Sequence, residues 1–133
     1  MHLFIITAPN QPGSLATILE AIAQKGVNVT TIGAATTGDS GPIALQANDD
    51  DSARAALQGI GANFREADVV SAWLEDKPGT LADAARRLGD AGVNIEALVP
   101  IGMQGGKVGI LIGVDNADAA RNALGDLVGA ASG

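Results

Sequence analysis

Short apolar runs alternate with amphipathic stretches along the chain and predict an alternation of strands and helices. The runs Leu3–Thr7 and Val69–Leu74 are short, apolar and contain β-branched residues, which is typical of strands. An apolar stripe after each run has the i, i+3, i+4, i+7 spacing of one helix face. These stripes, which we expect to be buried, are Leu15, Ile18, Leu19 and Ile22, and then Leu81, Ala84, Ala85 and Leu88.

The pattern occurs twice because the chain matches itself when it is shifted by 66 residues. Residues 12–28 (PGSLATILEAIAQKGVN) align with residues 78–94 (PGTLADAARRLGDAGVN) with seven identities and no gap. The same shift pairs Leu45 with Leu111 and Asp49 with Asp115. We infer an internal duplication, with repeat 1 at residues 1–66 and repeat 2 at residues 67–133.

Each repeat has the predicted order strand, helix, strand, strand, helix. The later strands are expected at Val27–Ile32, Ile43–Ala47, Val93–Val99 and Val108–Val114, and the second helices at about Ala53–Leu57 and Ala117–Val128. A fourth strand of repeat 1 is expected within Ala62–Ala67, and Ala62–Glu75 is predicted to be one long strand that serves both repeats. Repeat 2 ends in GAASG and lacks such a strand. A βαββαβ unit builds an antiparallel sheet with both helices on one face, so we predict an α+β, ferredoxin-like fold.

Composition and charge exclude several classes of function. The net charge is −7 and the only aromatic residues are Phe4, Phe64 and Trp73, which argues against a nucleic-acid partner. There is no cysteine and the only histidine is His2, so thiol chemistry, zinc–thiolate sites and histidine triads are excluded. We expect no metal and no cofactor, and we interpret Asp49–Asp51 as a solvated helix cap. No long uncharged apolar window or signal peptide is present, so we expect a soluble, cytoplasmic protein without membrane contact.

The two Pro-Gly segments carry a family resemblance. Two segments resemble the signature of ACT domains. The first is Asn10-x-Pro-Gly-Ser-Leu-Ala with a later Gly-Val-Asn-Val, and the second is Asp76-x-Pro-Gly-Thr-Leu-Ala with a later Gly-Val-Asn-Ile. The whole chain is similar to small stand-alone proteins made of two tandem ACT domains. The resemblance implies βαββαβ regulatory modules that commonly sense amino acids. Repeat 1 departs from the pattern at Asn10, where an acidic residue is common, and repeat 2 departs in its missing last strand.

The chemistry of the motif suits a small amino acid. A helix that starts at a Pro-Gly turn leaves its first N–H groups without intrahelical partners, and these groups favour a carboxylate. Gly13 and Gly79 allow a ligand to approach the backbone. Asp76 is also expected to be an N-cap. The candidate ligand-binding residues are Asn10, Gln11, Pro12, Gly13, Ser14, Leu15, Asn28, Thr30, Asp76, Lys77, Pro78, Gly79, Thr80, Leu81, Asn94 and Glu96.

We expect the site at a junction, with the turn and helix start of one repeat facing strand two of a neighbouring repeat. Asn28 or Asn94 would orient the carboxylate, and Asp76 or Glu96 would meet the ammonium group. The site at Asp76–Leu81 is slightly favoured. Each of these residues also has a structural interpretation, as a turn, a backbone cap or a solvated surface position.

An apolar outer sheet face is a further expectation. If Val70, Ala72 and Leu74 face the helices, Val69 and Trp73 face away. The 66-residue alignment places Ile110, Ile112 and Val114 on that outer face as well. An apolar face on an acidic protein implies cover by the other repeat or by a second chain, so we predict a homodimer.

Three functions remain open at this point. The first is a non-catalytic sensor that binds a small amino acid and signals to a regulated protein partner or another subunit. The second is a ligand-free interaction or oligomerisation module on the same fold. The third, an enzyme, is disfavoured because the chain lacks cysteine and tyrosine and has no evident pair of catalytic carboxylates.

Overall fold

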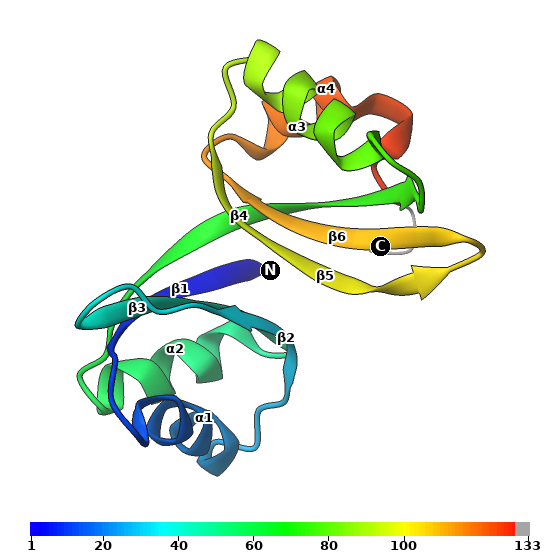
Figure 1. Ribbon diagram of the computed structural model, residues 1–133. Helices are drawn as coiled ribbons and strands as arrows, with labels where there is room; N and C mark the ends of the chain where they lie inside the picture. Colours follow the sequence, from blue (N-terminus) through cyan, green and yellow to red (C-terminus); the bar gives the residue numbers. More distant parts are fainter. Residues whose placement is uncertain (130–133) are drawn as a thin grey trace. The chain divides into compact units, whose positions relative to one another are not determined.

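A computed structural model describes residues 1–129 and shows a chain that divides into two compact units, Met1–Glu66 and Ala67–Gly133. The units are called unit 1 and unit 2. Each contains strands and two helices in the order that the sequence predicts (Figure 1). The fold is α+β, and each unit pairs its second and third strands, and its first and third strands, in the antiparallel direction.

Unit 1 is a four-stranded sheet covered on one face by two helices (Figure 1). Its elements are β1 (His2–Pro9), α1 (Ser14–Gln24), β2 (Val29–Ala34), β3 (Ser40–Ala47), α2 (Asp50–Gly59) and the start of β4 (Asn63–Glu75). The strands lie in the order β2-β3-β1-β4. The core lies between sheet and helices, and Phe4, Ile22, Leu45 and Leu57 are fully buried in it. The Phe4 and Phe64 rings, with centroids 5.9 Å apart, join β1 to β4.

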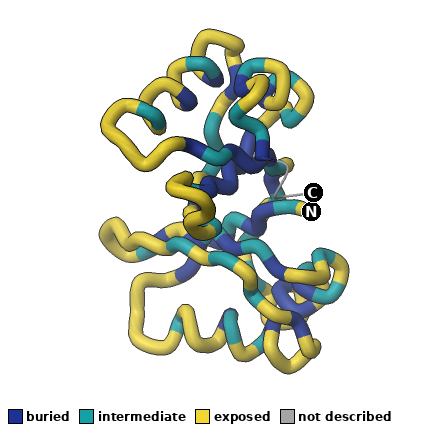
Figure 2. The backbone as a smooth tube through the Cα atoms, turned by 90° about the vertical axis from the view of Figure 1, so that its right-hand side faces the viewer, coloured by how far each residue is buried: buried dark blue, intermediate teal, exposed yellow. Residues whose placement is uncertain are grey.

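Unit 2 uses the rest of β4 and repeats the arrangement. Its further elements are α3 (Thr80–Asp90), β5 (Ile95–Gln104), β6 (Lys107–Val114), α4 (Ala117–Leu124) and a short 3₁₀ turn, η1 (Gly125–Leu127). The strands lie in the order β4-β6-β5. Its core joins Val70 and Ala72 of β4 to Leu88 of α3 and Leu124 of α4. In Figure 2 the buried segments of both units concentrate on the strands, whereas the turns are exposed.

The long strand β4 confirms that one segment serves both repeats. It runs from Asn63 to Glu75 and crosses the boundary between the units at Glu66. After α4, a single bridge pairs Ala72 with Val128, and the N–H of Gly129 donates to the Ser71 carbonyl. The expectation that GAASG forms no strand falls almost entirely on residues 130–133, which lie outside the described residues.

The predicted helix stripes are buried in their centres and exposed at their first positions. Ile18 and Leu88 are buried, but Leu15 is 41% exposed and its counterpart Leu81 is 44% exposed. Both lie in the first helical turn, and Leu15 lines a groove of about 140 Å³ instead of entering the core. Ala85 is exposed too, so the stripe prediction was wrong at these three positions.

The expectation for the outer face of unit 2 was wrong as well. Ile110 and Ile112 lie directly opposite Ala72 and Val70 in the β4–β6 ladder. Directly opposite residues share a sheet face, so these isoleucines face the helices and belong to the core. Val114 belongs to the same core. The cause is a slip in the repeat alignment: from β3 onward the units correspond at a shift of 67, and a one-residue slip turns every side chain to the other face.

Candidate functional site

The two Pro-Gly turns have the same backbone geometry. Gly13 and Gly79 are the N-cap residues of α1 and α3, with φ of 89° and 90°. Neither has a side chain that can cap the helix. The N–H of Ser14 donates to the Gln11 carbonyl and that of Thr80 to the Lys77 carbonyl, and the next N–H groups of each first turn have no side-chain acceptor from the N-cap. With the positive end of the helix dipole, these groups form a location that favours an anion.

Each turn is fixed to the neighbouring strand connection by the residue after the first strand. The Asn10 side chain donates to the Gly38 carbonyl at 2.9 Å, and the Asn10 N–H donates to the Asp39 carbonyl at 2.8 Å. In unit 2 the Asp76 N–H donates to the Gly106 carbonyl at 3.3 Å. Asp76 is therefore a turn residue, and the expectation that it is the N-cap was wrong because Gly79 holds that position.

The predicted asparagines lie one residue before β2 and β5, and Thr30 and Glu96 lie where the strand register shifts. The Asn28 N–H donates to the side-chain oxygen of Asn48 at 3.0 Å. In unit 2 the Asn94 N–H donates to Asp115 at 2.9 Å. Thr30 donates to the Gln46 carbonyl at 3.1 Å. In both asparagines the backbone N–H makes the contact, which holds the chain in place at the residue before β2 and before β5.

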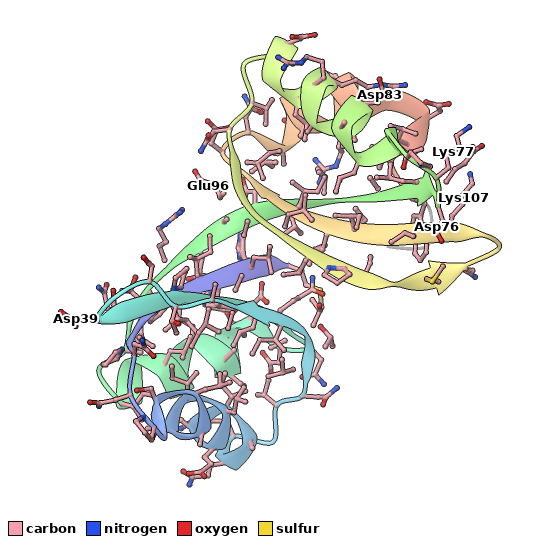
Figure 3. All side chains as sticks on the ribbon, in the orientation of Figure 1. Asp39, Asp76, Lys77, Asp83, Glu96 and Lys107 are labelled. Carbon is pink, nitrogen blue, oxygen red and sulfur yellow. The ribbon has the colours of Figure 1, made fainter. Side chains whose placement is uncertain are left out.

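Within one unit the turn and the start of strand two lie at opposite ends of the sheet. In unit 1, Pro9 pairs with Ser40 at one end of β3 and Val29 pairs with Ala47 at the other. Figure 3 shows the same separation in unit 2, with Glu96 at one end of β5 and Lys77 at the far end of β4. A site that contains both sets must therefore take them from different units or chains, and that arrangement stays a prediction.

A pocket of about 510 Å³ adjoins the turn of unit 1. It is lined by the end of β1, by residues 11–14 and Thr17 at the start of α1, and by residues 60–63 after α2. No charged side chain lines it. Its volume falls within the range of about 300–1,000 Å³ that is typical of small-molecule sites.

A pocket of about 420 Å³ adjoins the corresponding turn of unit 2. Lys77, Pro78, Gly79 and Thr80 line it, at the positions that Gln11, Pro12, Gly13 and Ser14 occupy in unit 1. Its other lining residues lie at the end of β4, at the start of β6 and in η1, and they include Trp73, Glu75, Asp83, Lys107 and Asp126. Repetition of a pocket against the same turn is the strongest feature of the site.

Opposite charges are paired at the mouth of the unit 2 pocket. Lys77 Nζ lies 2.8 Å from Glu75 Oε2. This hydrogen bond lowers the pKa of Glu75, and the charge of Lys107 lowers that pKa further. The same hydrogen bond raises the pKa of Lys77. At neutral pH both groups are charged.

Sequence reasoning did not find seven of the residues that line the unit 2 pocket, which are Trp73, Leu74, Glu75, Asp83, Lys107, Asp126 and Leu127. Trp73 and Glu75 end the strand before the motif, and Asp83 follows it by one helical turn. Lys107 and Asp126 are distant in sequence, and only the strand register and the fold bring them to the turn. Lys107 could have been assigned to the pocket from the pairing of β4 with β6, because this pairing places it directly opposite Glu75.

Comparison with known proteins gives one family match. Residues 2–58, which lie within unit 1, match the ACT domain family model. No curated protein matches the sequence. No helix within residues 1–129 is long and apolar enough to cross a membrane.

Solved structures are similar to nearly the whole chain. A protein from Bacteroides thetaiotaomicron is 25% identical with a TM-score of 0.76, covering 94% of this chain and 86% of that one. The ligand-free regulatory subunit of aspartate kinase from Thermus thermophilus is 22% identical with a TM-score of 0.66, covering 95% and 90%. The corresponding subunit from Thermus flavus is 20% identical with a TM-score of 0.64, again covering 95% and 90%. The last two similarities establish the fold alone.

Proposed function

We propose that this chain is a non-catalytic regulatory protein with two tandem ACT domains, and that it binds a small amino acid. The observation that carries the proposal is the repeated pocket beside the turns at Gly13 and Gly79. The ACT match over residues 2–58 supports a regulatory, ligand-binding role. The fold shared with an aspartate kinase regulatory subunit agrees with this role.

The proposed binding mode uses the helix start for the carboxylate. The first N–H groups of α1 or α3 donate hydrogen bonds to the carboxylate, and the glycine N-cap leaves the backbone accessible. Asn28 or Asn94 of a different unit or chain orients the carboxylate, and Asp76 or Glu96 meets the ammonium group. A ligand held in this way stabilises the arrangement of the units that it binds more tightly. The stabilisation equals at most the difference between its binding free energies for the two arrangements. That difference is the signal passed to a regulated partner in the cytoplasm.

A ligand-free interaction module is the second candidate, and a specific observation favours it. Ile32 on β2 is 39% exposed and Leu98 on β5 is 37% exposed, and the two strands occupy equivalent places in their units. Leu15 and Leu81 are exposed as well, and β2 and β5 are the last strands in the sheet order, so each unit exposes large apolar side chains and a strand edge. Exposed apolar groups and open strand edges are typical of surfaces that bind another protein, and a homodimer is the form that we propose.

A thermal denaturation screen against the twenty amino acids separates the two candidates. A ligand that binds only the folded protein raises the melting temperature in a concentration-dependent way. The sensor proposal predicts such a rise for one or a few amino acids. If all twenty leave the melting temperature unchanged at millimolar concentration, while light scattering shows a dimer, the interaction module is the better description.

A further inference from the structure

The segment that follows the last helix forms one wall of the unit 2 pocket. We call residues 125–129 the C-terminal strap; it consists of η1, Val128 and Gly129. Asp126 and Leu127 of the strap line the pocket. Leu127 corresponds to Ile60 at a shift of 67, and Ile60 lines the pocket of unit 1. The same segment therefore builds the same wall in both units.

The two units attach this wall to the sheet in different ways. In unit 1 it continues directly into β4, which pairs with β1. In unit 2 the chain returns from α4 to the sheet (Figure 1), where an isolated bridge joins Val128 to Ala72 and the Gly129 N–H donates to the Ser71 carbonyl at 3.0 Å. An isolated bridge fixes less backbone than a ladder, and segments with few such bonds open at a lower free energy than the core.

A fixed point precedes the strap. Arg87 of α3 donates to the Leu124 carbonyl at 3.2 Å and so holds the end of α4. Gly125 follows with a φ of 56°, a conformation that favours glycine. Beyond this point Asp126 forms an ion pair of 3.7 Å with Arg87, but its side chain is 91% exposed, and exposed ion pairs contribute little to stability. The chain is therefore anchored firmly before Gly125 and weakly after it.

The indole ring of Trp73 contacts both the pocket and the strap. Trp73 lines the pocket, and a Cβ at Gly129 would overlap its Cδ1 and Nε1 atoms, so the strap backbone lies against this edge of the ring. The Nε1 atom is buried and makes no hydrogen bond with any described residue. A buried donor without an acceptor is unfavourable. Docking of the strap therefore carries a penalty, and opening relieves it because water then reaches the indole N–H.

We propose that the C-terminal strap opens and closes the unit 2 pocket, and that a molecule bound in this pocket holds the strap closed. This inference rests on the proposed function and deepens it, because it describes how one of the two sites is regulated. The coupling is reciprocal: a ligand that contacts the docked strap stabilises docking, and docking raises the affinity for that ligand by the same factor. In unit 1 the equivalent wall is continuous with β4 and stays in place.

Hydrogen exchange of the full chain, followed by NMR, tests whether the strap opens by itself. We expect the amide of Gly129 to exchange at least about 100-fold faster than that of Ile112 in the core, yet more slowly than in an unstructured peptide. Acrylamide, a small neutral quencher, reports on Trp73, the only tryptophan of the chain. Its access to the indole should follow the opening of the strap.

Gly129→Ala should release the strap because its Cβ has no room beside the indole. We expect acrylamide to quench this variant several-fold more strongly than the wild type, with emission at longer wavelength. Protection of the Ile112 amide shows that the core of the variant is folded. Gly59→Ala is the matched control: it lies at the position equivalent to Asp126 in unit 1, and a Cβ there meets no atom within 4 Å. It should leave both signals unchanged.

A second measurement adds each amino acid except tryptophan at millimolar concentration and records heat and hydrogen exchange. An amino acid that binds should slow the exchange of Gly129 at least about 10-fold at saturation, because binding and opening compete. It should also reduce quenching by acrylamide. Gly129→Ala should bind the same amino acid at least about 10-fold more weakly, whereas Gly59→Ala should keep the wild-type affinity.

The results that overturn the inference can be told apart from failure of the proposed function. If Gly129 exchanges at the rate of Ile112 or of an unstructured peptide, or if Gly129→Ala leaves acrylamide quenching unchanged, the strap does not open and close. If an amino acid binds but the exchange of Gly129 does not slow, the coupling is wrong and the proposed function stands. If no amino acid gives a heat signal, the proposed function and the inference that rests on it are both wrong.

Discussion

Leu45 and Ile112 occupy the same place in the two units although they lie 67 residues apart. Leu45 pairs with Phe4 across β1 and β3, and Ile112 pairs with Val70 across β4 and β6. Phe4 and Val70 themselves are 66 residues apart. The additional residue of unit 2 lies within β5, where the register shifts between Pro100 and Gly102, and every later element is displaced by that residue.

Replacing either residue by alanine should strongly destabilise the unit that contains it. Leu45 is fully buried and Ile112 is 1% exposed. Leu45→Ala and Ile112→Ala should each lower the free energy of unfolding by about 2–5 kcal/mol because they leave cavities in a packed core. Chemical denaturation measures the loss. Met103→Ala, at a highly exposed position, is the control and should change stability by less than about 0.5 kcal/mol. A small effect of Ile112→Ala would place that residue outside the core.

The ion pair between Arg54 and Glu66 should make stability depend on pH. Arg54 donates two hydrogen bonds to Glu66, at 2.6 and 2.7 Å, and they lower the pKa of Glu66. A carboxyl group whose pKa is lower in the folded state stabilises the fold above its unfolded pKa of about 4.3 and loses this contribution as the pH falls through the folded value.

Glu66→Gln should therefore be less stable than the wild type at pH 7, and the difference should shrink as the pH falls below about 4. Urea denaturation at several pH values measures this difference. Glu20→Gln, on the exposed face of α1, should track the wild type at each pH. A difference between Glu66→Gln and the wild type that is constant from pH 7 to pH 3 would contradict the assignment.

Two glycines at opposite ends of α3 should respond in opposite ways to alanine. Gly79 has a φ of 90°, which an alanine adopts only with strain, so Gly79→Ala should cost about 1–2 kcal/mol. Gly89 lies inside α3 and a Cβ there meets no atom within 4 Å, so Gly89→Ala should stabilise by about 0.4–1 kcal/mol. Thermal unfolding distinguishes the two. Destabilisation by both variants would show that the backbone of α3 differs from the one described.

The absence of a side chain at Gly109 makes room for Trp73. The two residues pair across β4 and β6, and a Cβ at Gly109 would lie 2.7 Å from the indole ring. Gly109→Ala should therefore displace the indole, lower stability by about 1–3 kcal/mol and shift the emission of the only tryptophan. Gly105→Ala, in the β5–β6 turn, is the control for emission because a Cβ there contacts nothing. Unchanged emission from Gly109→Ala would show that the indole does not lie over this glycine.

The order of elements could be predicted from the sequence because local signals specify it. The Pro-Gly turns fixed the starts of α1 and α3, and the β4 segment was recognised as one strand for both repeats. The predicted second helix of repeat 2 was too long. It reaches only Leu124, where Gly125 with a φ of 56° begins a 3₁₀ turn.

The register of β6 could not be predicted from the same signals. The strand before it contains no identity that reveals its one additional residue, and Leu111 lies one position from the true counterpart of Leu45. An error of one residue moved three core side chains to the wrong face. The pocket residues Lys107 and Asp126 were missed because only the folded register brings them to the turn.

The path of β4 determines where this chain can be divided. The boundary after Glu66 falls inside a hydrogen-bonded strand, so neither unit has a natural point of separation. A fragment that ends at Glu75 would carry an unpaired extension with Val70, Ala72 and Leu74 uncovered, which is an aggregation hazard. New chain termini, as in a circular permutant, are better tolerated in the exposed turn at Gly105 and Gly106. The two units share one strand, and the chain is best handled undivided.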